Sequence, residues 1–464
     1  MADPIQPPAP AGGASASRRV RIGCGAGFSN DRIDPARDLA ERGALDFLFF
    51  ECLAERTLAN AHALRAADPK AGYDPWLRKR MEAVLRPCRE AGTRVVSNMG
   101  SANPGAAGEA VAEVARSLGL QGLKVAVVEG DDVSALMTPD LELMDGEGRL
   151  GDVPLRMTGA NAYLGHEPIA QALAEGAEVV ITGRCADPSL AVGPLAHAFG
   201  WAADDWARIG AGTLVGHLLE CSTQVTGGYY ADPGRKDVPG LAYLGFPYAE
   251  VAEDGSAVLT KLDGTGGLVS RGTVLEQMLY EVHDPAAYLT PDVTADFSGA
   301  RLEESGRDRV AVSGGSGRAR PETLKVTIGF DGGFLSEGEI SYAGPNALAR
   351  ARLAGEVIET RMREVHGHQG PIRADLIGLS ALHGSARDPD APPPYEPTEV
   401  RLRMALRTHD RDLAEALPRE VEGAWLSGPA GGGGARGRVT PAVTTRSALL
   451  PRGLARPTVR MITA

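Results

Sequence analysis

Five short apolar runs, each followed by a helical stretch, constrain the fold of this chain more than any other feature. They are "RVRIGCG" (19–25), "ALDFLFFE" (44–51), "GTRVVSNMG" (92–100), "LKVAVVEG" (123–130) and "AEVVITGR" (177–184). Because the apolar residues do not alternate with polar ones, these runs are typical of strands that are buried on both faces. Strands that alternate with helices predict βαβ units, so we expect an α/β fold with an open, mostly parallel sheet and helices on both faces.

The sequence changes character in its C-terminal third. The runs "TLKVTIGF" and "EGEISYAG" read as paired strands, and the stretches that follow them extend the order to β-β-α-β-β-α. This order predicts an α+β domain with an antiparallel sheet. We therefore expect a disordered leader over 1–18, an α/β core with Gly-rich loops over 19–300, and the α+β domain with a Gly-rich tail over 301–464.

The net charge of −12 and the placement of the five cysteines exclude several classes of protein. An acidic chain lacks the basic face of a nucleic-acid binder, and no apolar run reaches the ~18 residues needed to span a bilayer. The cysteines form no CxxC pair and share no zinc-like spacing with a histidine, so we expect free thiols and no metal site. The sequence therefore predicts a cytoplasmic protein that binds neither nucleic acid nor membrane.

Polar residues gather where the apolar runs end, and the carboxyl ends of parallel strands meet at the sheet edge where ligands bind. Glu51 ends the second run without capping an obvious helix. A partly desolvated carboxylate with a raised pKa, suited to general acid/base catalysis, is predicted there; the alternative is a solvated glutamate at a strand end. The candidate catalytic residues are Glu51, Asn98, Arg184 and Asp187, and the candidate substrate-binding residues are Asp31, Arg32, Ser101, Asn103 and Asn161.

Arg184 and Asp187 each have a structural alternative to a catalytic role. An arginine at the mouth of a buried strand, close to helix N-termini, is typical of an anion-binding site, but a salt bridge to Glu51 or Asp187 is an equal alternative. Asp187 precedes Pro188 at the start of a helical stretch, which predicts first of all an N-cap with a depressed pKa. His166 also precedes a helical stretch, and we expect it at the surface.

Two Gly-rich segments could bind phosphate or a dinucleotide. "GCGAGF" (23–28) follows the first strand but lacks the third glycine of the dinucleotide-binding motif, which makes an NAD site a weak prediction. In "GTGG", Gly264, Thr265, Gly266 and Gly267 precede a helical stretch and could cradle a phosphate or carboxylate; a plain turn is the alternative. We expect no cofactor, with coenzyme A entering only as part of a substrate.

The segments "SNMGSANPG", "GANAYLG", "TGRCADPSLAVGPL", "CSTQVTGGYYADPG" and "KLDGTGGLVSRGTVLEQMLYEVHDP" occur in this order along the chain. In these segments, and from about residue 19 to about 445, the chain resembles the acyclic terpene utilisation (AtuA) family. The resemblance implies that the protein acts together with enzymes that degrade citronellol and geraniol through branched acyl-CoA thioesters. Many members carry an appended small ferredoxin-fold domain that this sequence lacks after Ala464, so we expect a separate chain of that fold as a partner.

Together these features predict an enzyme that acts on a branched or terpenoid acyl-CoA, or another carrier-bound acyl group, by hydration, dehydration or a related lyase step. Glu51 would move a proton, while Asn98, Asn103 and Arg184 would hold the thioester carbonyl or a carboxylate. The Gly-rich loops would receive the phosphates of the carrier. A non-catalytic subunit that stabilises a partner enzyme is the alternative from another class, and an NAD-dependent oxidoreductase is a third. We also expect a homo-oligomer.

Overall fold

The computed structural model describes residues 18–382 and 397–464, and these form two compact units. Unit 1 comprises the described residues of Met1–Val153, Thr158–Ile328 and Arg446–Ala464; unit 2 comprises those of Pro154–Met157 and Gly329–Thr445. The leader predicted for residues 1–18 lies outside the described residues except for Arg18. Each unit has its own buried core.

A ten-stranded mixed sheet organises unit 1. Its middle consists of five parallel strands, in the order β1 (Arg19–Cys24), β2 (Phe47–Phe50), β3 (Arg94–Ser97), β6 (Val179–Thr182) and β4 (Lys124–Glu129). Antiparallel strands extend both sides: β7 (Pro247–Ala252), β8 (Ala257–Lys261), β12 (Arg309–Ser313) and β11 (Arg301–Gly306) beyond β1, and β18 (Thr458–Thr463) beyond β4. The predicted α/β fold is confirmed, but the sheet is mixed and not mostly parallel, since the parallel pairing is confined to the five apolar runs.

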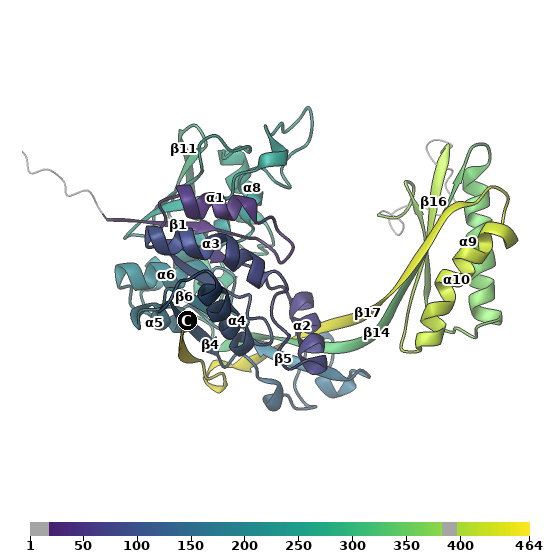
Figure 1. The fold of residues 1–464 in the computed structure, drawn as a ribbon, viewed down its shortest axis with the longest axis horizontal. Coiled ribbons are helices and arrows are strands. Elements are labelled where there is room, and N and C mark those ends of the chain that lie inside the picture. The colour runs from purple at the N-terminus through teal and green to yellow at the C-terminus, as the bar shows by residue number, and fades with distance from the viewer. Residues whose placement is uncertain (1–17, 383–396) are drawn as a thin grey trace, which may run out of the picture. The chain divides into compact units, whose positions relative to one another are not determined.

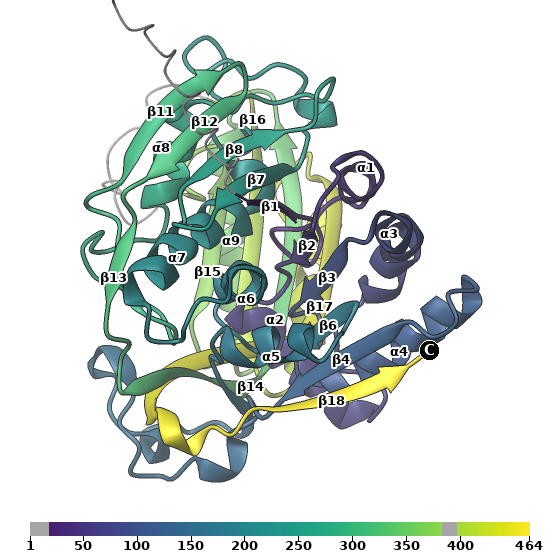
Figure 2. The same ribbon diagram turned by 90° about the vertical axis from the view of Figure 1, so that its left-hand side faces the viewer.

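Helices cover both faces of this sheet (Figure 2). The chain moves in one direction from β1 through β2 and β3 to β4, so right-handed crossovers place α1 (Asp34–Arg42), α3 (Leu77–Ala91) and α4 (Pro104–Ser117) on one face. It then turns back to insert β6 between β3 and β4, and α5 (Glu167–Ala174), α6 (Ser189–Phe199) and α7 (Trp206–Glu220) cover the other face. Unit 1 also contains α2 (Glu55–Ala67), α8 (Arg271–Leu279) and a small sheet of β9 (Tyr288–Leu289), β10 (Thr294–Asp296) and β13 (Ser316–Arg318).

Unit 2 is built around an antiparallel sheet with two helices on one side (Figure 1). Its elements follow the order β14 (Thr323–Ala343), α9 (Ala347–Glu364), β15 (Ile372–Ile377), β16 (Glu399–Thr408), α10 (Arg411–Ser427) and β17 (Gly433–Pro451). The strand order β15-β16-β14-β17, with β5 (Met157–Ala162) pairing with β14, gives a ferredoxin-like βαββαβ arrangement. The predicted antiparallel α+β character is therefore confirmed.

Two details of the C-terminal third differ from the prediction. The two runs that we expected to pair with each other form one long strand, β14. The chain continues through Gly332 and Gly333 and does not reverse its direction there. The boundary between the units lies at Gly329 and not at residue 301, and the last residues of the chain return to unit 1 as β18. Local strand signals do not say which sheet a strand joins, since that depends on pairing between distant residues.

Candidate functional site

The carboxyl ends of β2, β3 and β6 are neighbours, and they bring the four predicted catalytic residues together. Glu51 follows β2, and its Oε1 accepts hydrogen bonds from Asn98 Nδ2 (3.0 Å) and from the backbone N–H of Leu53 (2.8 Å). Asn98, which follows β3, is fully buried, and its Oδ1 accepts from the backbone N–H of Cys52 (2.8 Å). Asn98 therefore fixes the position of Glu51, and both the nitrogen and the oxygen of its amide have partners within the protein.

The pKa of Glu51 is strongly shifted. Burial, reinforced by the charge of Asp187, raises its pKa from 4.5 to about 8, although Arg184 and the two hydrogen bonds oppose the shift. At neutral pH the side chain is therefore mainly the carboxylic acid, which can donate a proton. The raised pKa expected for a desolvated glutamate at a strand end is present.

Arg184 is enclosed by acceptors. Its side chain is 1% exposed, its Nε donates to the backbone oxygen of Cys185 (2.7 Å), and its two terminal nitrogens contact the backbone oxygens of Leu53 and Cys185 and the carboxylate of Asp187. The guanidinium carbon lies 4.4 Å from the centre of the Tyr163 ring. The salt-bridge alternative is thus the one observed. Arg184 supplies a fixed positive charge at the site, and all three of its side-chain nitrogens have partners within the protein.

Asp187 does not cap a helix, which corrects the prediction made from its position before Pro188. Helix α6 begins at Ser189 without a side-chain cap, and the Asp187 carboxylate contacts Arg184 instead. An ion pair with a buried guanidinium is stronger than a hydrogen bond to a helix N–H, so the side chain turns away from the helix. Its side chain is 37% exposed, and partial burial raises its pKa where a cap would have lowered it.

A chain of buried polar groups supports Arg184 from behind. The Oδ2 atom of Asp131, after β4, accepts hydrogen bonds from the backbone N–H of Arg184 (2.7 Å) and from Asn161 Nδ2 (2.8 Å). His62 Nε2 lies 2.6 Å from Asn161 Oδ1. Asn161, predicted to bind substrate, is instead a buried link in this chain. His62 lay in a helical stretch with no signal that pointed to the site.

Glu55, Tyr163 and Lys325 form a second polar cluster beside Arg184 that the sequence did not reveal. Glu55 Oε1 accepts hydrogen bonds from the Tyr163 hydroxyl (2.6 Å) and from Lys325 Nζ (2.9 Å). Burial raises the pKa of Glu55, but these two donors outweigh it and lower the pKa to about 2. Two glutamates only four positions apart therefore differ: Glu55 stays ionised at neutral pH, and Glu51 holds its proton.

The remaining predicted residues after β1 and β3 lie at the same edge but serve local structure. Asn103, predicted to bind substrate, caps α4 and accepts from the backbone N–H of Ala106 (3.3 Å). Ser101 is buried, in a left-handed conformation with φ 48°. Asp31 accepts two backbone N–H groups of its own loop, and Arg32 is exposed and reaches backbone oxygens of residues 241 and 242.

The "GTGG" loop is a turn whose N–H groups donate to backbone oxygens of the protein. The N–H groups of Gly266 and Gly267 donate to the backbone oxygens of Tyr243 (2.8 Å) and Pro239 (2.7 Å), and that of Thr265 donates within the turn. These amides are occupied, so the loop has the character of the turn alternative and not of a phosphate cradle. No contact joins it to Glu51 among the hydrogen bonds of the described residues.

The glycines of "GCGAGF" are explained by packing. A Cβ atom on Gly25 would lie 2.5 Å from the Phe50 ring, and one on Gly27 would lie 2.6 Å from the backbone of Cys221. The N–H of Gly25 already donates to a strand carbonyl, and that of Gly27 to Asp31. The loop therefore needs small residues for reasons that have nothing to do with a dinucleotide.

His166 is buried, contrary to the surface position expected for it. Its Nδ1 lies 2.8 Å from Asp292 Oδ1, and Ser189 Oγ donates to Asp292 Oδ2 (2.5 Å). Burial would lower the pKa of His166, but the charge of Asp292 outweighs it and the pKa is raised. The carboxylate lies between the hydroxyl and the imidazole, so the histidine does not contact the hydroxyl as a nucleophile's base must. This cluster ties α5 and α6 to the segment before β10.

The five cysteines are free thiols, as predicted. Burial raises the pKa of Cys185 and of Cys88 to about 12, so neither is a reactive thiolate. Within residues 18–382 and 397–464, no group of histidine, cysteine and acidic side chains is arranged to hold a metal ion. No helix in the same ranges is long and apolar enough to cross a membrane.

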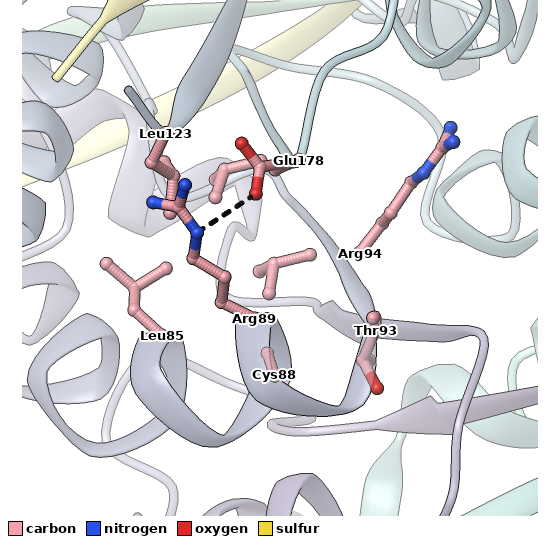
Figure 3. Close-up of a pocket in the computed structure, with 10 residues that line it drawn as sticks. Leu85, Cys88, Arg89, Thr93, Arg94, Leu123 and Glu178 are labelled. Atoms are coloured by element: carbon pink, nitrogen blue, oxygen red, sulfur yellow. Dashed lines mark ion pairs between the residues drawn. The ribbon is translucent and has the colours of Figure 1, made fainter. Parts of the chain in front are cut away.

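A small pocket of about 90 Å³ lies at the opposite, amino-terminal edge of β3 and β6 (Figure 3). Leu85 and Leu123 form part of its wall, and Arg89 pairs with Glu178 across it at 3.6 Å. The pocket is too small for a thioester, and its charges are paired with each other. The raised pKa values of Glu51 and Asp187 belong to the carboxyl edge of the sheet, not to this pocket.

A family model decides the relationship of the chain to known proteins. The model described as "Acyclic terpene utilisation family protein AtuA" matches residues 20–461. The chain belongs to the AtuA family. Membership in the AtuA family implies involvement in the utilisation of acyclic terpenes. No curated protein and no solved structure matches the chain.

Proposed function

We propose that this AtuA protein is an enzyme that adds water to, or removes it from, a branched or terpenoid acyl thioester carried by coenzyme A or another carrier. The observation that carries the proposal is Glu51, a carboxylic acid at neutral pH that Asn98 holds in place at the ligand-binding edge of a parallel sheet. Proton transfer beside a thioester carbonyl needs such a group. Family membership supports the substrate class.

Glu51 and Asp187 supply the acid and the base of the proposed reaction. Each raises the other's tendency to hold a proton, and Arg184 pairs with Asp187, so the pair is expected to share one proton near neutral pH. In hydration of an unsaturated thioester, the oxygen of water bonds to the β-carbon and its proton passes to Asp187. Glu51 gives its proton to the α-carbon. Transfer of a proton from Asp187 to Glu51 restores the starting state, and dehydration runs the same steps in reverse.

Three residues first expected to hold the thioester carbonyl have other tasks. Asn98, Asn103 and Arg184 are each committed to partners within the protein. Arg184 can still stabilise negative charge on the substrate through its field, since a buried guanidinium a short distance from the reacting atoms acts without direct contact. Asn98 contributes by orienting Glu51.

Titration calorimetry with a panel of acyl-CoA thioesters of different length and branching tests the proposal. We expect binding of at least one unsaturated thioester, and its hydration measured by loss of enoyl absorbance. Glu51→Gln should keep binding and lose turnover. Glu178→Gln, at the other edge of the same sheet, is the matched control and should keep both. No binding across the panel would overturn the proposal.

A non-catalytic role in stabilising a partner enzyme is the second candidate. It is favoured if thioesters bind and the hydration rate of wild type does not exceed that of Glu51→Gln. The raised pKa of Glu51 argues for the catalytic role, because a binding protein gains nothing from holding a proton on a destabilised carboxylate.

A further inference from the structure

The C-terminal end of α7 lies at the same edge of the sheet as Glu51. Gly216 of α7 packs directly on the loop that carries Asp187: a Cβ on Gly216 would lie 2.7 Å from the backbone oxygen of Pro188. At the end of the helix, Cys24 Sγ, in the last residue of β1, lies 3.8 Å from the backbone oxygen of Glu220. The helix is therefore fixed on both the β1 and the β6 sides of the site.

His217 and Glu220 form a buried pair on this last turn. His217 Nδ1 lies 3.0 Å from Glu220 Oε1, and the two residues are 2% and 8% exposed. The imidazole stacks on Phe297 at 5.7 Å and contacts the ring of Tyr288 at 5.2 Å. Burial lowers the pKa of His217 to about 4 and raises that of Glu220 well above its ordinary value. The pair is therefore a neutral imidazole hydrogen-bonded to a carboxylic acid.

The second oxygen of Glu220 is without a hydrogen-bond partner among the described residues, although it is buried. Leaving such an atom unpaired destabilises the folded protein. The side-chain oxygen of Gln277, in α8, is unpaired in the same described part of the chain, while its Nε2 donates to the backbone oxygen of His217 (2.8 Å). Native proteins rarely keep such buried atoms unpaired unless a ligand or water completes them.

The groups around Glu220 come from several elements. Asp187, Glu281 and Arg184 act on it through their charges, and Tyr288 and Cys221 face it as well. Ser222 and Glu281 adopt left-handed backbone conformations, with φ 49° and 57°. Residues with such backbone conformations are concentrated at ligand sites. A pocket of about 380 Å³ begins at the next residue along the chain: Cys221, Asp31 and Tyr280 are among the residues that line it, and Glu220 itself is not.

We propose that Glu220, held by His217, binds the hydroxyl group of the ligand: the β-hydroxyl of a hydroxyacyl thioester, or the water from which it is formed. A hydroxyl donates its single proton to the unpaired Glu220 oxygen, whereas a water molecule has two protons and can donate to the Gln277 oxygen as well. An apolar group would leave both oxygens unpaired, and an anion would meet the carboxyl groups of Asp187 and Glu281. This inference rests on the proposed function and deepens it by assigning the group that distinguishes hydrated from dehydrated substrate.

Two thioesters that differ only in the β-hydroxyl test the assignment: a 3-hydroxyacyl-CoA and the saturated acyl-CoA of the same chain. By calorimetry, wild type should bind the hydroxylated ligand about tenfold more tightly, the worth of one hydrogen bond to an otherwise unpaired buried group. Glu220→Leu should lose this preference by weakening only the hydroxylated ligand. Glu220→Gln should retain it, because its amide N–H can donate to His217 while its oxygen accepts from the ligand.

Glu276→Gln is the matched control, since Glu276 is an exposed carboxylate of α8 that pairs with Lys236, and its replacement should leave the preference unchanged. If Glu220→Leu does not fold, His217→Phe keeps the ring stack, releases Glu220 and should reduce the preference. Equal affinity of wild type for the two thioesters, or an undiminished preference in Glu220→Leu or, where needed, in His217→Phe, overturns the inference and leaves the proposed function standing. Failure of both thioesters to bind wild type overturns both.

Discussion

Glutamate and arginine side chains form clusters at two places in this protein. The ratio of carboxyl groups to guanidinium groups differs between the two clusters. On the sheet of unit 2, Glu337 accepts hydrogen bonds from Arg403 (3.0 Å) and Arg438 (2.7 Å), and Glu339 likewise lies between two arginines. At the edge of the sheet in unit 1, the carboxyl groups of Glu51, Asp187 and Glu220 lie around Arg184. The side-chain nitrogens of Arg184 have partners within the protein.

The ratio of carboxyl groups to guanidinium groups decides whether each glutamate holds a proton. Burial raises the pKa of Glu337 and of Glu339, but two guanidinium partners each outweigh it, so both pKa values end below the ordinary value. Around Arg184 the carboxyl groups outnumber the cation, so burial prevails and the pKa of Glu51 reaches about 8. A glutamate with two arginines serves structure, whereas one that competes for a single arginine keeps a proton that chemistry can use.

The largest expected effect is on turnover. Replacing Glu51 by Gln removes the proton donor and keeps the hydrogen bonds to Asn98 and Leu53, so kcat for enoyl-thioester hydration should fall by at least about 100-fold, the usual contribution of a general acid. Glu337→Gln should leave kcat unchanged. Steady-state kinetics of both variants, with circular dichroism to confirm folding, decides whether the two clusters differ in function. Equal losses in the two variants would abolish the distinction.

The second prediction concerns stability against pH. Glu51 has a folded pKa of about 8 against an ordinary 4.5, so its unfavourable burial as an anion makes the protein less stable as pH rises from about 4.5 to 8. The lowered pKa values of Glu337 and Glu339 act in the opposite sense: their stabilisation is present above the unfolded pKa and is lost as pH falls through the folded pKa.

Chemical denaturation at pH 5 and pH 8 separates these contributions. Glu51→Gln should be more stable relative to wild type at pH 8 than at pH 5, because the neutral amide has no ionisation to oppose. Glu337→Gln should show no such difference between pH 5 and pH 8; its loss of stability should instead shrink below about pH 4, which denaturation at pH 3 measures. A Glu51→Gln variant whose stability difference from wild type is the same at both pH values would contradict the raised pKa.

The third prediction tests the structural cluster alone. Arg403 also donates to Asp375 Oδ2 (2.7 Å), so Arg403→Met leaves two part-buried carboxylates short of a partner and should cost about 1–3 kcal/mol of stability. Arg411→Met is the control, since its i,i+4 pair with Glu415 is exposed and is worth about 0.5 kcal/mol or less. Denaturant melts measure both, and thioester binding should be unaffected by either.

The sequence predicts the site in unit 1 better than the network in unit 2, for a physical reason. Glu51, Asn98 and Arg184 each follow a buried run, and parallel strands deliver their ends to one edge whatever the detailed pairing. The arginines that bracket Glu337 come from β16 and β17, and only the register of an antiparallel sheet brings them together. The role of Asp187 was misread because a cap is a local signal and its partner Arg184 competes for the same carboxylate. A separate ferredoxin-fold partner chain stays a prediction.

The smallest expected effect is a shift in the pKa of Glu51 on changing its neighbour. Asp187→Asn removes a like charge and leaves Arg184 without its carboxylate partner, and both changes favour the ionised form of Glu51. Its pKa should therefore fall toward the ordinary value, and Glu51 should come to resemble Glu337. Carbon-13 NMR titration of labelled glutamate side chains, or the pH dependence of kcat/KM, measures the shift. If Asp187 acted only as a helix cap, asparagine would cap α6 about as well and the titration of Glu51 would stay where it is in wild type.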